Sequence, residues 1–232
     1  MTPRPVKSQS QADNGSTRTV DRAFDLLSKV TESQSGVSLS ELARATDLPP
    51  ATASRLLGTL AKRGLVRRDE QGCYRTGLGL MQMAAMVLRG EPLYELAGGH
   101  LAALAEATNE TANLGIAVDA DRALYLRQIA GDQRVQTVSW TGRTIPRQGT
   151  AMGAALAGRL EPAGYAVSRG SLEPEITAIA APVRDYRDEI VAALSIIAPS
   201  YRTEDRDVDR YGLLLVEHAA ALSAALGASE VR

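Results

Sequence analysis

Residues 38–64, SLSELARATDLPPATASRLLGTLAKRG, decide the fold of the N-terminal part of this chain. Ser38 is followed three residues later by Glu41, the spacing of a capping box that begins a helix. Apolar residues recur at helical spacing up to Pro49-Pro50, where the helix must break because proline lacks an amide donor and restricts the residue before it. A second helix follows, and Gly64 is typical of a helix C-cap. Two short helices joined by a tight turn form a helix-turn-helix, whose second helix can enter the major groove of DNA.

The residues that follow strengthen this interpretation. Residues 65–75, LVRRDEQGCYR, predict two short strands around a turn at residues 70–72, and a basic hairpin directly after a recognition helix is a wing. The alternative is a small helical subdomain without a ligand, because paired amphipathic helices are common. The capped helix, proline turn, polar second helix and basic hairpin occur together and in this order, which favours DNA binding.

The segment before the helix-turn-helix predicts a polar tail and one helix. Residues 1–17 are polar and contain two prolines, so we expect a disordered tail and no signal peptide. Residues 19–31 place apolar side chains on one helical face, and we expect Phe24, the only phenylalanine, in the core. Arg18 and Arg22 lie at the start of this helix, where they either reach DNA phosphates or remain solvated.

Composition limits the class of protein. The 232 residues suffice for two modest domains. A lone cysteine, Cys73, excludes an internal disulfide and fits a reducing cytoplasm, and no apolar run is long enough to span a membrane. Residues 18–78 carry ten basic and seven acidic residues, whereas residues 79–232 carry fourteen and nineteen. A basic N-terminal part followed by an acidic C-terminal part supports a DNA-binding module joined to a sensing domain.

Residues 78–90, LGLMQMAAMVLRG, predict an apolar helix between the two parts of the chain. Methionine is a flexible apolar filler, and a helix with so few charges needs a partner to cover it. We expect a linker helix that packs in a dimer interface. The alternative is that it packs on its own domain.

The remaining residues predict an α+β domain that begins and ends with a helix. The whole chain is thus predicted to have four segments: a tail at 1–17, a winged helix-turn-helix at 18–77, a linker helix at 78–91 and the second domain at 92–232. We expect helices at 92–110, 150–159 and 203–226, and strands at 111–118, 123–130, 135–140, 165–167, 176–183 and 190–198.

The sequence offers no signature of an enzyme, metal site or cofactor site. His100 and His218 have no metal-ligand spacing around them, and none of the common nucleophile, phosphate-binding or dinucleotide motifs occurs. We therefore expect no catalytic residue, no metal and no cofactor, and we interpret Cys73 as a passive residue of the wing. Thr150 is a natural N-cap, so the amides of Ala151 and Met152 could hold a small carboxylate, with Ser195 completing a pocket. An ordinary capped helix is the alternative.

Three segments together resemble the IclR-type bacterial transcriptional regulators. They are residues 38–80, residues 142–158 (GRTIPRQGTAMGAALAG) and residues 178–196 (AIAAPVRDYRDEIVAALSI), so the likeness runs nearly from end to end. The resemblance implies an N-terminal winged helix-turn-helix, a linker helix and a C-terminal GAF-like effector-binding domain. It also implies homodimers, or dimers of dimers, with double-stranded DNA as the partner.

Carried over by position, the resemblance implies a set of DNA-binding residues. Recognition-helix contacts would come from Pro50, Ala51, Thr52, Ser54 and Arg55, and further contacts from Arg18, Arg22, Ser38 and the wing residue Arg75. The family's usual lysine-serine pair is Pro50-Ala51 here, which removes a polar contact and alters the operator that can be read.

The resemblance also implies an effector site at Ala151, Met152 and Ser195, as in members that bind small keto acids. An aspartate of those members is replaced by Ser168 and a cysteine by Ala178. Both changes remove polar partners, which favours a larger or more apolar acid, for example an aromatic one. The connection at 160–164 is shorter than usual in the family, so the pocket is either more open or closed by a partner subunit.

The sequence thus predicts a cytoplasmic, homo-oligomeric, effector-responsive transcription factor, a repressor by default, on a near-palindromic operator. The rival hypothesis is a small-molecule-binding or catalytic α+β protein whose N-terminal helices serve assembly, with His100 as the test residue. A third hypothesis is an architectural DNA-binding protein without a ligand.

Overall fold

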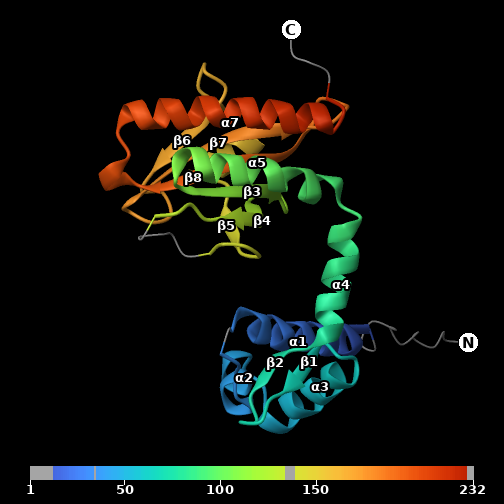
Figure 1. The fold of residues 1–232 in the computed structure, drawn as a ribbon. Coiled ribbons are helices and arrows are strands. Elements are labelled where there is room, and N and C mark those ends of the chain that lie inside the picture. Colours follow the sequence, from blue (N-terminus) through green and yellow to red (C-terminus); the bar gives the residue numbers. More distant parts are fainter. Residues whose placement is uncertain (1–12, 34, 134–138, 229–232) are drawn as a thin grey trace, which may run out of the picture. The chain divides into compact units, whose positions relative to one another are not determined.

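The computed structural model describes residues 13–33, 35–133 and 139–228 (Figure 1). The chain divides into two compact units, with the division between Gly90 and Glu91. Most of the strand expected at 135–140 falls on residues 134–138, outside the described residues, and the described residues 139 and 140 have no strand conformation. Within the described residues, no helix is both long and apolar enough to cross a bilayer.

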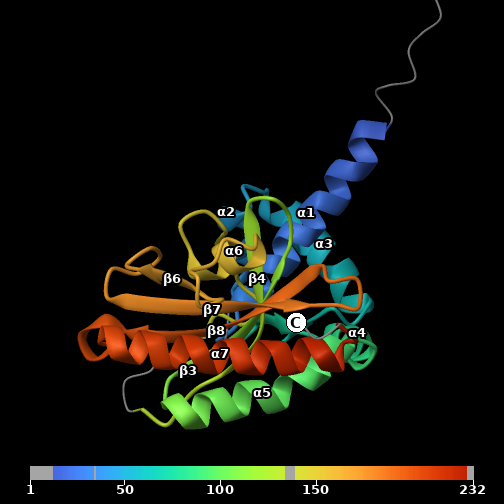
Figure 2. The same cartoon turned by 90° about the horizontal axis from the view of Figure 1, so that it is seen from above.

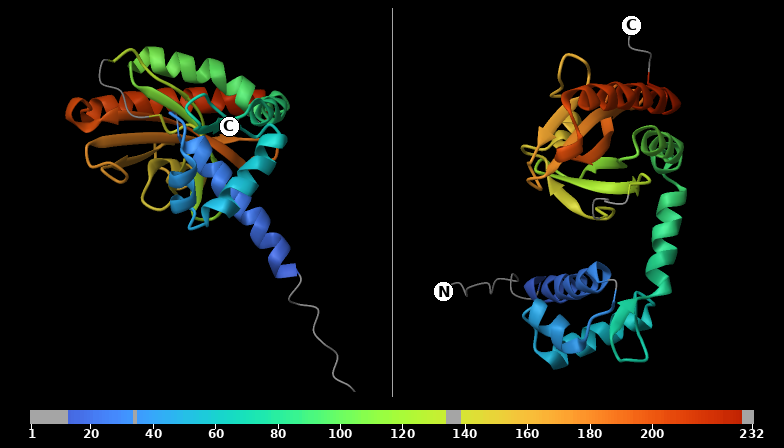
Figure 3. Two further views of the ribbon diagram at one scale, coloured as in Figure 1. Left: turned by 90° about the horizontal axis from the view of Figure 1, so that it is seen from below. Right: turned by 60° about the vertical axis from the view of Figure 1, so that its left-hand side comes forward.

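The N-terminal unit is a helical core with a hairpin and a further helix. Its elements are α1 (Asp13–Glu32), α2 (Leu39–Ala45), α3 (Pro50–Lys62), β1 (Val66–Arg68), β2 (Tyr74–Thr76) and α4 (Leu78–Arg89). The two strands pair antiparallel, and Figure 3 shows their hairpin at the end of α3. α1 begins at Asp13, so residues 13–17 are helical. The prediction of a disordered tail up to residue 17 was therefore wrong for residues 13–17. Residues 13–18 contain no proline, so each backbone amide there is able to join the helix upstream of Thr19.

The prediction that Phe24 belongs to the core was wrong, because its side chain is 63% exposed. The core of this unit takes Leu26, Leu27 and Val30 from α1 instead. Phe24 and Val20 lie on the neighbouring stripe of the helix, where they line an apolar hollow between α1 and α3. The apolar face of α1 is therefore wider than the stripe that its own unit covers.

Helix α4 is apolar and largely uncovered within its unit. None of its residues is buried, and large side chains such as Leu78, Met86 and Val87 are exposed. Leu80 packs partly against the core. Within the described residues, α4 therefore contacts its own unit mainly through Leu80 and leaves most of its apolar side chains exposed.

The C-terminal unit is built on a six-stranded antiparallel sheet with helices on both faces. The strand order is β5-β4-β3-β8-β7-β6. The strands are β3 (Thr111–Ala117), β4 (Arg122–Ile129), β5 (Thr144–Pro146), β6 (Ala166–Arg169), β7 (Ile176–Arg184) and β8 (Ile190–Pro199). β5, a three-residue strand at the edge of the sheet, was not predicted from the sequence.

Three helices cover the sheet. Helices α5 (Pro92–Thr108) and α7 (Asp205–Ala225) lie along one face, and α6 (Ala151–Leu156) lies on the other (Figure 2). A short 3-10 turn, η2 (Ser200–Arg202), connects β8 to α7.

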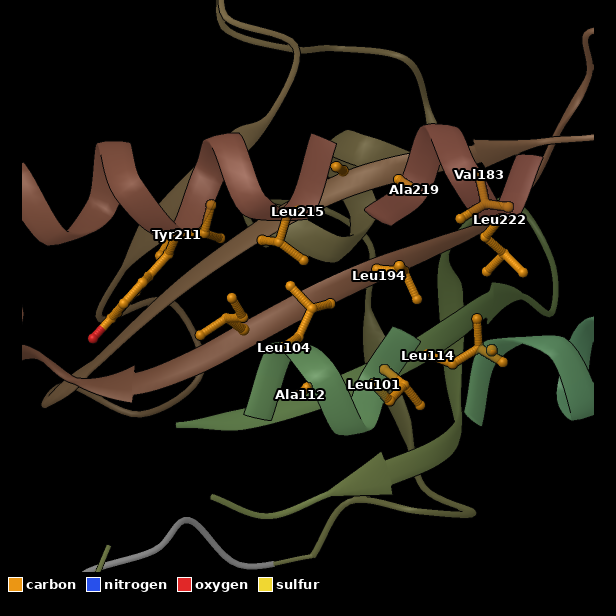
Figure 4. Packing of buried hydrophobic residues seen from close by; sticks show 14 of the residues in the cluster. Leu101, Leu104, Ala112, Leu114, Val183, Leu194, Tyr211, Leu215, Ala219 and Leu222 are labelled. Atoms are coloured by element: carbon orange, nitrogen blue, oxygen red, sulfur yellow. The ribbon is translucent and has the colours of Figure 1, made fainter. Parts of the chain in front are cut away.

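Alternation along the strands separates two cores. Leu114 of β3 and Leu194 of β8 face α5 and α7, where they meet Leu101, Leu104 and Leu215 (Figure 4). Their neighbours in sequence point to the opposite face, which packs against α6. The side chains expected to bind an effector belong to this second face.

Candidate DNA interface and effector pocket

The helix-turn-helix forms as its local signals predict. The Ser38 hydroxyl accepts from the amide of Glu41, and the Glu41 carboxylate accepts from the amide of Ser38, so the capping box is complete. Hydrogen bonds from Ser38 hold the pKa of the Glu41 carboxyl below its ordinary value. The turn passes through Asp47 in the left-handed region, a conformation that aspartate tolerates, and Pro50 occupies the first position of α3. The Ser38 hydroxyl is thus engaged in capping α2.

Helix α3 presents a polar stripe away from its core face. Ala53, Leu56, Leu57 and Leu60 are buried, as predicted from their spacing. Of the residues expected to contact DNA, Pro50, Ala51, Ser54 and Arg55 are exposed and Thr52 is half-buried. Among these predicted contact residues, the exposed ones therefore offer the hydroxyl of Ser54 and the guanidinium of Arg55 to a groove of DNA.

The wing is held together by an internal ion pair. Arg75 lies opposite Arg67 in the two-stranded sheet, and its Nε donates to Asp69 Oδ2 at 2.6 Å. This hydrogen bond is the main reason that the pKa of Asp69 lies below its ordinary value. Arg68 Nε donates to the carbonyl of Gly72 across the turn. Arg75, expected to contact DNA, thus also stabilises the hairpin, and Arg67 of the same basic run is exposed.

Arg18 and Arg22 lie one turn apart on α1, where Arg18 is exposed and Arg22 half-buried. Helix α1 packs beside α3, since Val20 and Phe24 line the same hollow as Arg55. The structure therefore brings the first helix and the recognition helix together.

The candidate effector pocket lies between α6 and the sheet. Ser168, Ala178 and Ile197 are neighbours across β6, β7 and β8, and all three line it. The Thr150 hydroxyl caps α6 by accepting from the amide of Gly153. The Ala151 amide, expected to hold a carboxylate, donates to the Ser168 hydroxyl at 3.0 Å. Within the described chain the Met152 amide pairs with no acceptor, so it is the amide left for a ligand.

The lining of the pocket is mainly apolar. It comprises Tyr125, Trp140, Thr150, Ala151, Met152, Ser168, Ser171, Leu172, Glu173, Ile176, Ala178 and Ile197. The pocket has an empty volume of about 470 Å³ with its mouth included.

Ser195, also expected in the site, lies deeper than the lining. Its side chain is 1% exposed, two residues before Ile197 on the same face of β8. Tyr125 is buried beside it, and this burial raises the pKa of the tyrosine to about 12, an effect that the nearby Ser195 hydroxyl partly offsets. Tyr125 and Trp140 also line the pocket, and neither was predicted from the sequence, because no motif marks the segments that carry them.

The two histidines do not belong to this pocket. His100 of α5 and His218 of α7 contact each other, with 3.1 Å between their Nδ1 atoms. Burial, and then the charge of His218, lower the pKa of His100. Both helices lie on the face of the sheet opposite α6. Within the described residues, no three His, Cys, Asp or Glu side chains are grouped so that they could hold a metal ion.

The fold and the two sites define a class of protein: a winged-helix DNA-binding unit joined to an α+β unit with a ligand pocket, as in ligand-responsive transcription factors. Family comparison makes this specific. The IclR helix-turn-helix domain matches residues 19–70, and the C-terminal domain of bacterial IclR transcriptional regulators matches residues 85–163 and 158–224. The chain belongs to the IclR family of transcriptional regulators.

Individual relatives agree with this assignment. The regulator BhcR of Paracoccus denitrificans is 28% identical over 254 residues, covering 91% of this chain and 88% of the relative. The repressor AllR of Escherichia coli K12 is 26% identical, covering 97% and 95%. An IclR homolog of Microbacterium hydrocarbonoxydans, solved in complex with 4-hydroxybenzoate, has the same fold, with a TM-score of 0.75, 22% identity and coverage of 91% and 100%.

The comparisons also locate a shortened segment. The alignment with BhcR, 254 residues, is longer than this whole chain, so the relative carries segments that have no counterpart here. The C-terminal family model matches in two pieces that meet at residues 158–163. Leu160, Glu161 and Pro162 line a separate hollow beside Ala166 and Val167, and none of them lines the effector pocket. In the described chain these three residues therefore lie outside the effector pocket.

Proposed function

We propose that this regulator is a repressor that binds a near-palindromic operator as a homodimer or dimer of dimers, and that a small carboxylic acid in the pocket between α6 and the sheet alters its affinity for DNA. The observation that carries the DNA-binding part is the exposed face of α3, with Ser54 and Arg55 outward and a basic hairpin directly after it. The printed name of the relative AllR supports repression as the direction of control.

In this proposal the recognition helix reads bases and its surroundings hold phosphates. Arg55 would contact a guanine edge, a bidentate contact worth about 1–3 kcal/mol of discrimination. Thr52 and Ser54 would supply weaker polar contacts, because Pro50 and Ala51 offer no side-chain donor. Arg18, Arg22 and Arg67 would hold phosphates, with Arg75 supporting the wing and Ser38 supporting α2.

Dimerisation supplies the symmetry that a near-palindromic operator requires. The exposed apolar side chains of α4, among them Met81, Met83 and Met86, form a surface that a second copy would cover. Two winged heads held in this way would read half-sites about 34 Å apart, one helical turn of DNA, or a multiple of it. We place this protein in the cytoplasm, where its DNA is.

The effector is proposed to be an acid with an apolar body. The Met152 amide and the Thr150 and Ser168 hydroxyls would meet its polar end, while Ile176 and Ile197 would contact the rest. Helix α6 has only six residues, so these groups, rather than a long helix dipole, would hold the ligand. Binding of effector and of operator would be reciprocally coupled, typically by about 1–3 kcal/mol.

The test is a gel shift on the DNA immediately upstream of the protein's own gene. Wild-type protein should retard this DNA, and retardation should weaken steeply with added salt because phosphate contacts release counterions. Arg55→Ala should lose specific retardation while the oligomer stays intact. Arg206→Ala, which removes a 79% exposed arginine of the C-terminal unit, is the matched control and should bind normally. Unchanged binding by Arg55→Ala would overturn the recognition-helix assignment.

The rival enzymatic hypothesis gains no support from the pocket. His100, its proposed catalytic residue, lies against His218 between α5 and α7 and does not line the pocket. We therefore propose that the protein is not an enzyme. Turnover of an acyl or keto-acid substrate that is lost in His100→Gln would reverse this proposal.

A further inference from the structure

Two buried polar side chains in the centre of the sheet have no partners. Asn113 of β3 and Ser195 of β8 lie directly opposite each other and are 0% and 1% exposed. Within the described chain, neither polar atom of the Asn113 amide forms a hydrogen bond. The Ser195 hydroxyl lies beside the Tyr125 hydroxyl and lowers its pKa, but within the described chain it has no partner at full hydrogen-bond geometry. Buried polar groups in folded proteins are nearly always paired, so three unpaired atoms side by side call for an explanation.

These side chains lie next to the effector pocket. Their neighbours Ala112, Leu114 and Leu194 face α5 and α7, so Asn113 and Ser195 face α6, on the side of the pocket. Ile197, which lines the pocket, is two residues further along β8, a separation of about 7 Å. Ala178 of the pocket lining pairs with Ile197, and Ala180 pairs with Ser195. Asn113, Ser195 and Ala180 thus form a row across the sheet, directly beside the row of Ile197 and Ala178 that lines the pocket.

Two side chains separate this row from the pocket. Tyr125 lines the pocket and also lies beside Ser195. Met152 lines it too and packs over Gly115, two residues after Asn113, where a Cβ would meet the Met152 sulfur at 2.5 Å. Methionine has three rotatable side-chain bonds and adapts readily, so it can move aside without a change in the backbone. A ligand that displaces Met152 would reach Asn113 and Ser195.

We propose that Asn113 and Ser195, together with the Tyr125 hydroxyl, form the inner end of the effector pocket and bind an uncharged hydroxyl or carbonyl group of the effector. This inference rests on the proposed function. An amide offers both a donor and an acceptor, which suits a hydroxyl because a hydroxyl also donates and accepts.

The same surroundings exclude a charged group at this end. The side chains that line the pocket include no lysine, arginine or histidine, and Glu173 among them is acidic. A buried carboxylate without a cation is strongly disfavoured. The effector class is therefore a monocarboxylic acid whose acid group stays near the mouth and whose far end carries a hydroxyl or keto group.

The experiment titrates the full-length protein with matched pairs of acids and follows Trp140, the only tryptophan, whose side chain lines the pocket. The pairs are 4-hydroxybenzoate and benzoate, 4-hydroxyphenylacetate and phenylacetate, and 4-oxopentanoate and pentanoate. In at least one pair the wild type should bind the member with the distal polar group at least tenfold more tightly. Asn113→Ala and Ser195→Ala should each reduce this ratio to threefold or less, because each variant removes a partner of the distal polar group.

Two further variants distinguish a loss of ligand binding from a loss of folding. Asn113→Ser keeps a small polar group and should retain part of the preference if Asn113→Ala does not fold. Thr177→Val is the matched control, because Thr177 is also fully buried on this sheet but its hydroxyl pairs with Ser200. It should keep the full preference between the two acids.

Each other outcome overturns the inference. If the wild type binds both members of every pair equally, and the acids still release operator DNA, the inference fails while the proposed function stands. The same holds if Asn113→Ala and Ser195→Ala keep the wild-type preference. If no acid binds, the inference and the proposed effector fail together, and operator retardation alone then decides whether the DNA-binding part survives.

Discussion

The ion pair between Glu110 and Arg202 should be essential for the C-terminal unit. Glu110 precedes β3 and Arg202 lies in the turn after β8, so the pair ties together the ends of two neighbouring strands. Nε and Nη2 of the arginine each donate to one carboxylate oxygen at 2.8 Å, and the glutamate side chain is only 5% exposed. Replacing Arg202 by leucine would leave the carboxylate buried without its partner.

The expected loss follows from this geometry. Removing one partner of a buried ion pair costs about 3–5 kcal/mol. Arg202 is 21% exposed, so water can partly replace it, and we expect a loss near the lower end, about 3 kcal/mol. At about 2–4 °C per kcal/mol for a chain of this size, the melting temperature should fall by about 6–12 °C.

The assay is urea unfolding followed by Trp140 fluorescence. Because Trp140 is the only tryptophan, the signal reports the C-terminal unit alone. Adding Glu110→Gln to Arg202→Leu should recover much of the loss, because the second change removes the uncompensated charge. A loss below about 1 kcal/mol would refute the reasoning, and so would a double variant no more stable than Arg202→Leu, since breaking a buried pair costs several times more.

Three further perturbations test other parts of the structure. Ser38→Ala removes the cap of α2 and should cost about 0.5–2 kcal/mol, seen as faster hydrogen exchange of the first α2 amides; unchanged exchange would contradict the capping role. Gly115→Ala brings a Cβ against the flexible end of the Met152 side chain and should cost about 1 kcal/mol, the low end for overpacking, in urea unfolding, with a smaller loss in a Met152→Ala background. The pKa of His100 is lower in the folded protein than its ordinary 6.5, so the unfolded chain binds the proton more readily. Stability should therefore be full above pH 6.5 and decrease as the pH falls through the folded pKa, and His100→Gln should flatten this slope in unfolding curves measured at several pH values.

Local interactions explain why the helix-turn-helix could be predicted. The reciprocal bonds of Ser38 and Glu41 join residues three apart, and Gly64 adopts a positive φ of 70° directly after α3, where a left-handed residue is needed. Each feature depends on a few consecutive residues, so the sequence carries it in full. The same holds for most strands and helices of the C-terminal unit, whose existence follows from hydrophobic periodicity.

Periodicity does not say which part of an apolar face is covered. Phe24 and Leu26 lie on the same helix, yet only Leu26 is buried, because the neighbouring helices decide which stripe faces the core. The strand β5 is only three residues long and forms through its pairing with β4, a contact that no local pattern marks.

The sequence by itself determined four features: the winged helix-turn-helix, the exposure of Ser54 and Arg55, the apolar character of α4 and the α+β class of the second unit. Each of these depends on residue spacing within one segment of the chain. Only the tertiary structure decided that Arg75 supports the wing through Asp69, and that Asn113 and Ser195 meet unpaired beside the pocket. Residues 113 and 195 are distant in the chain, and strand order and register alone place them side by side.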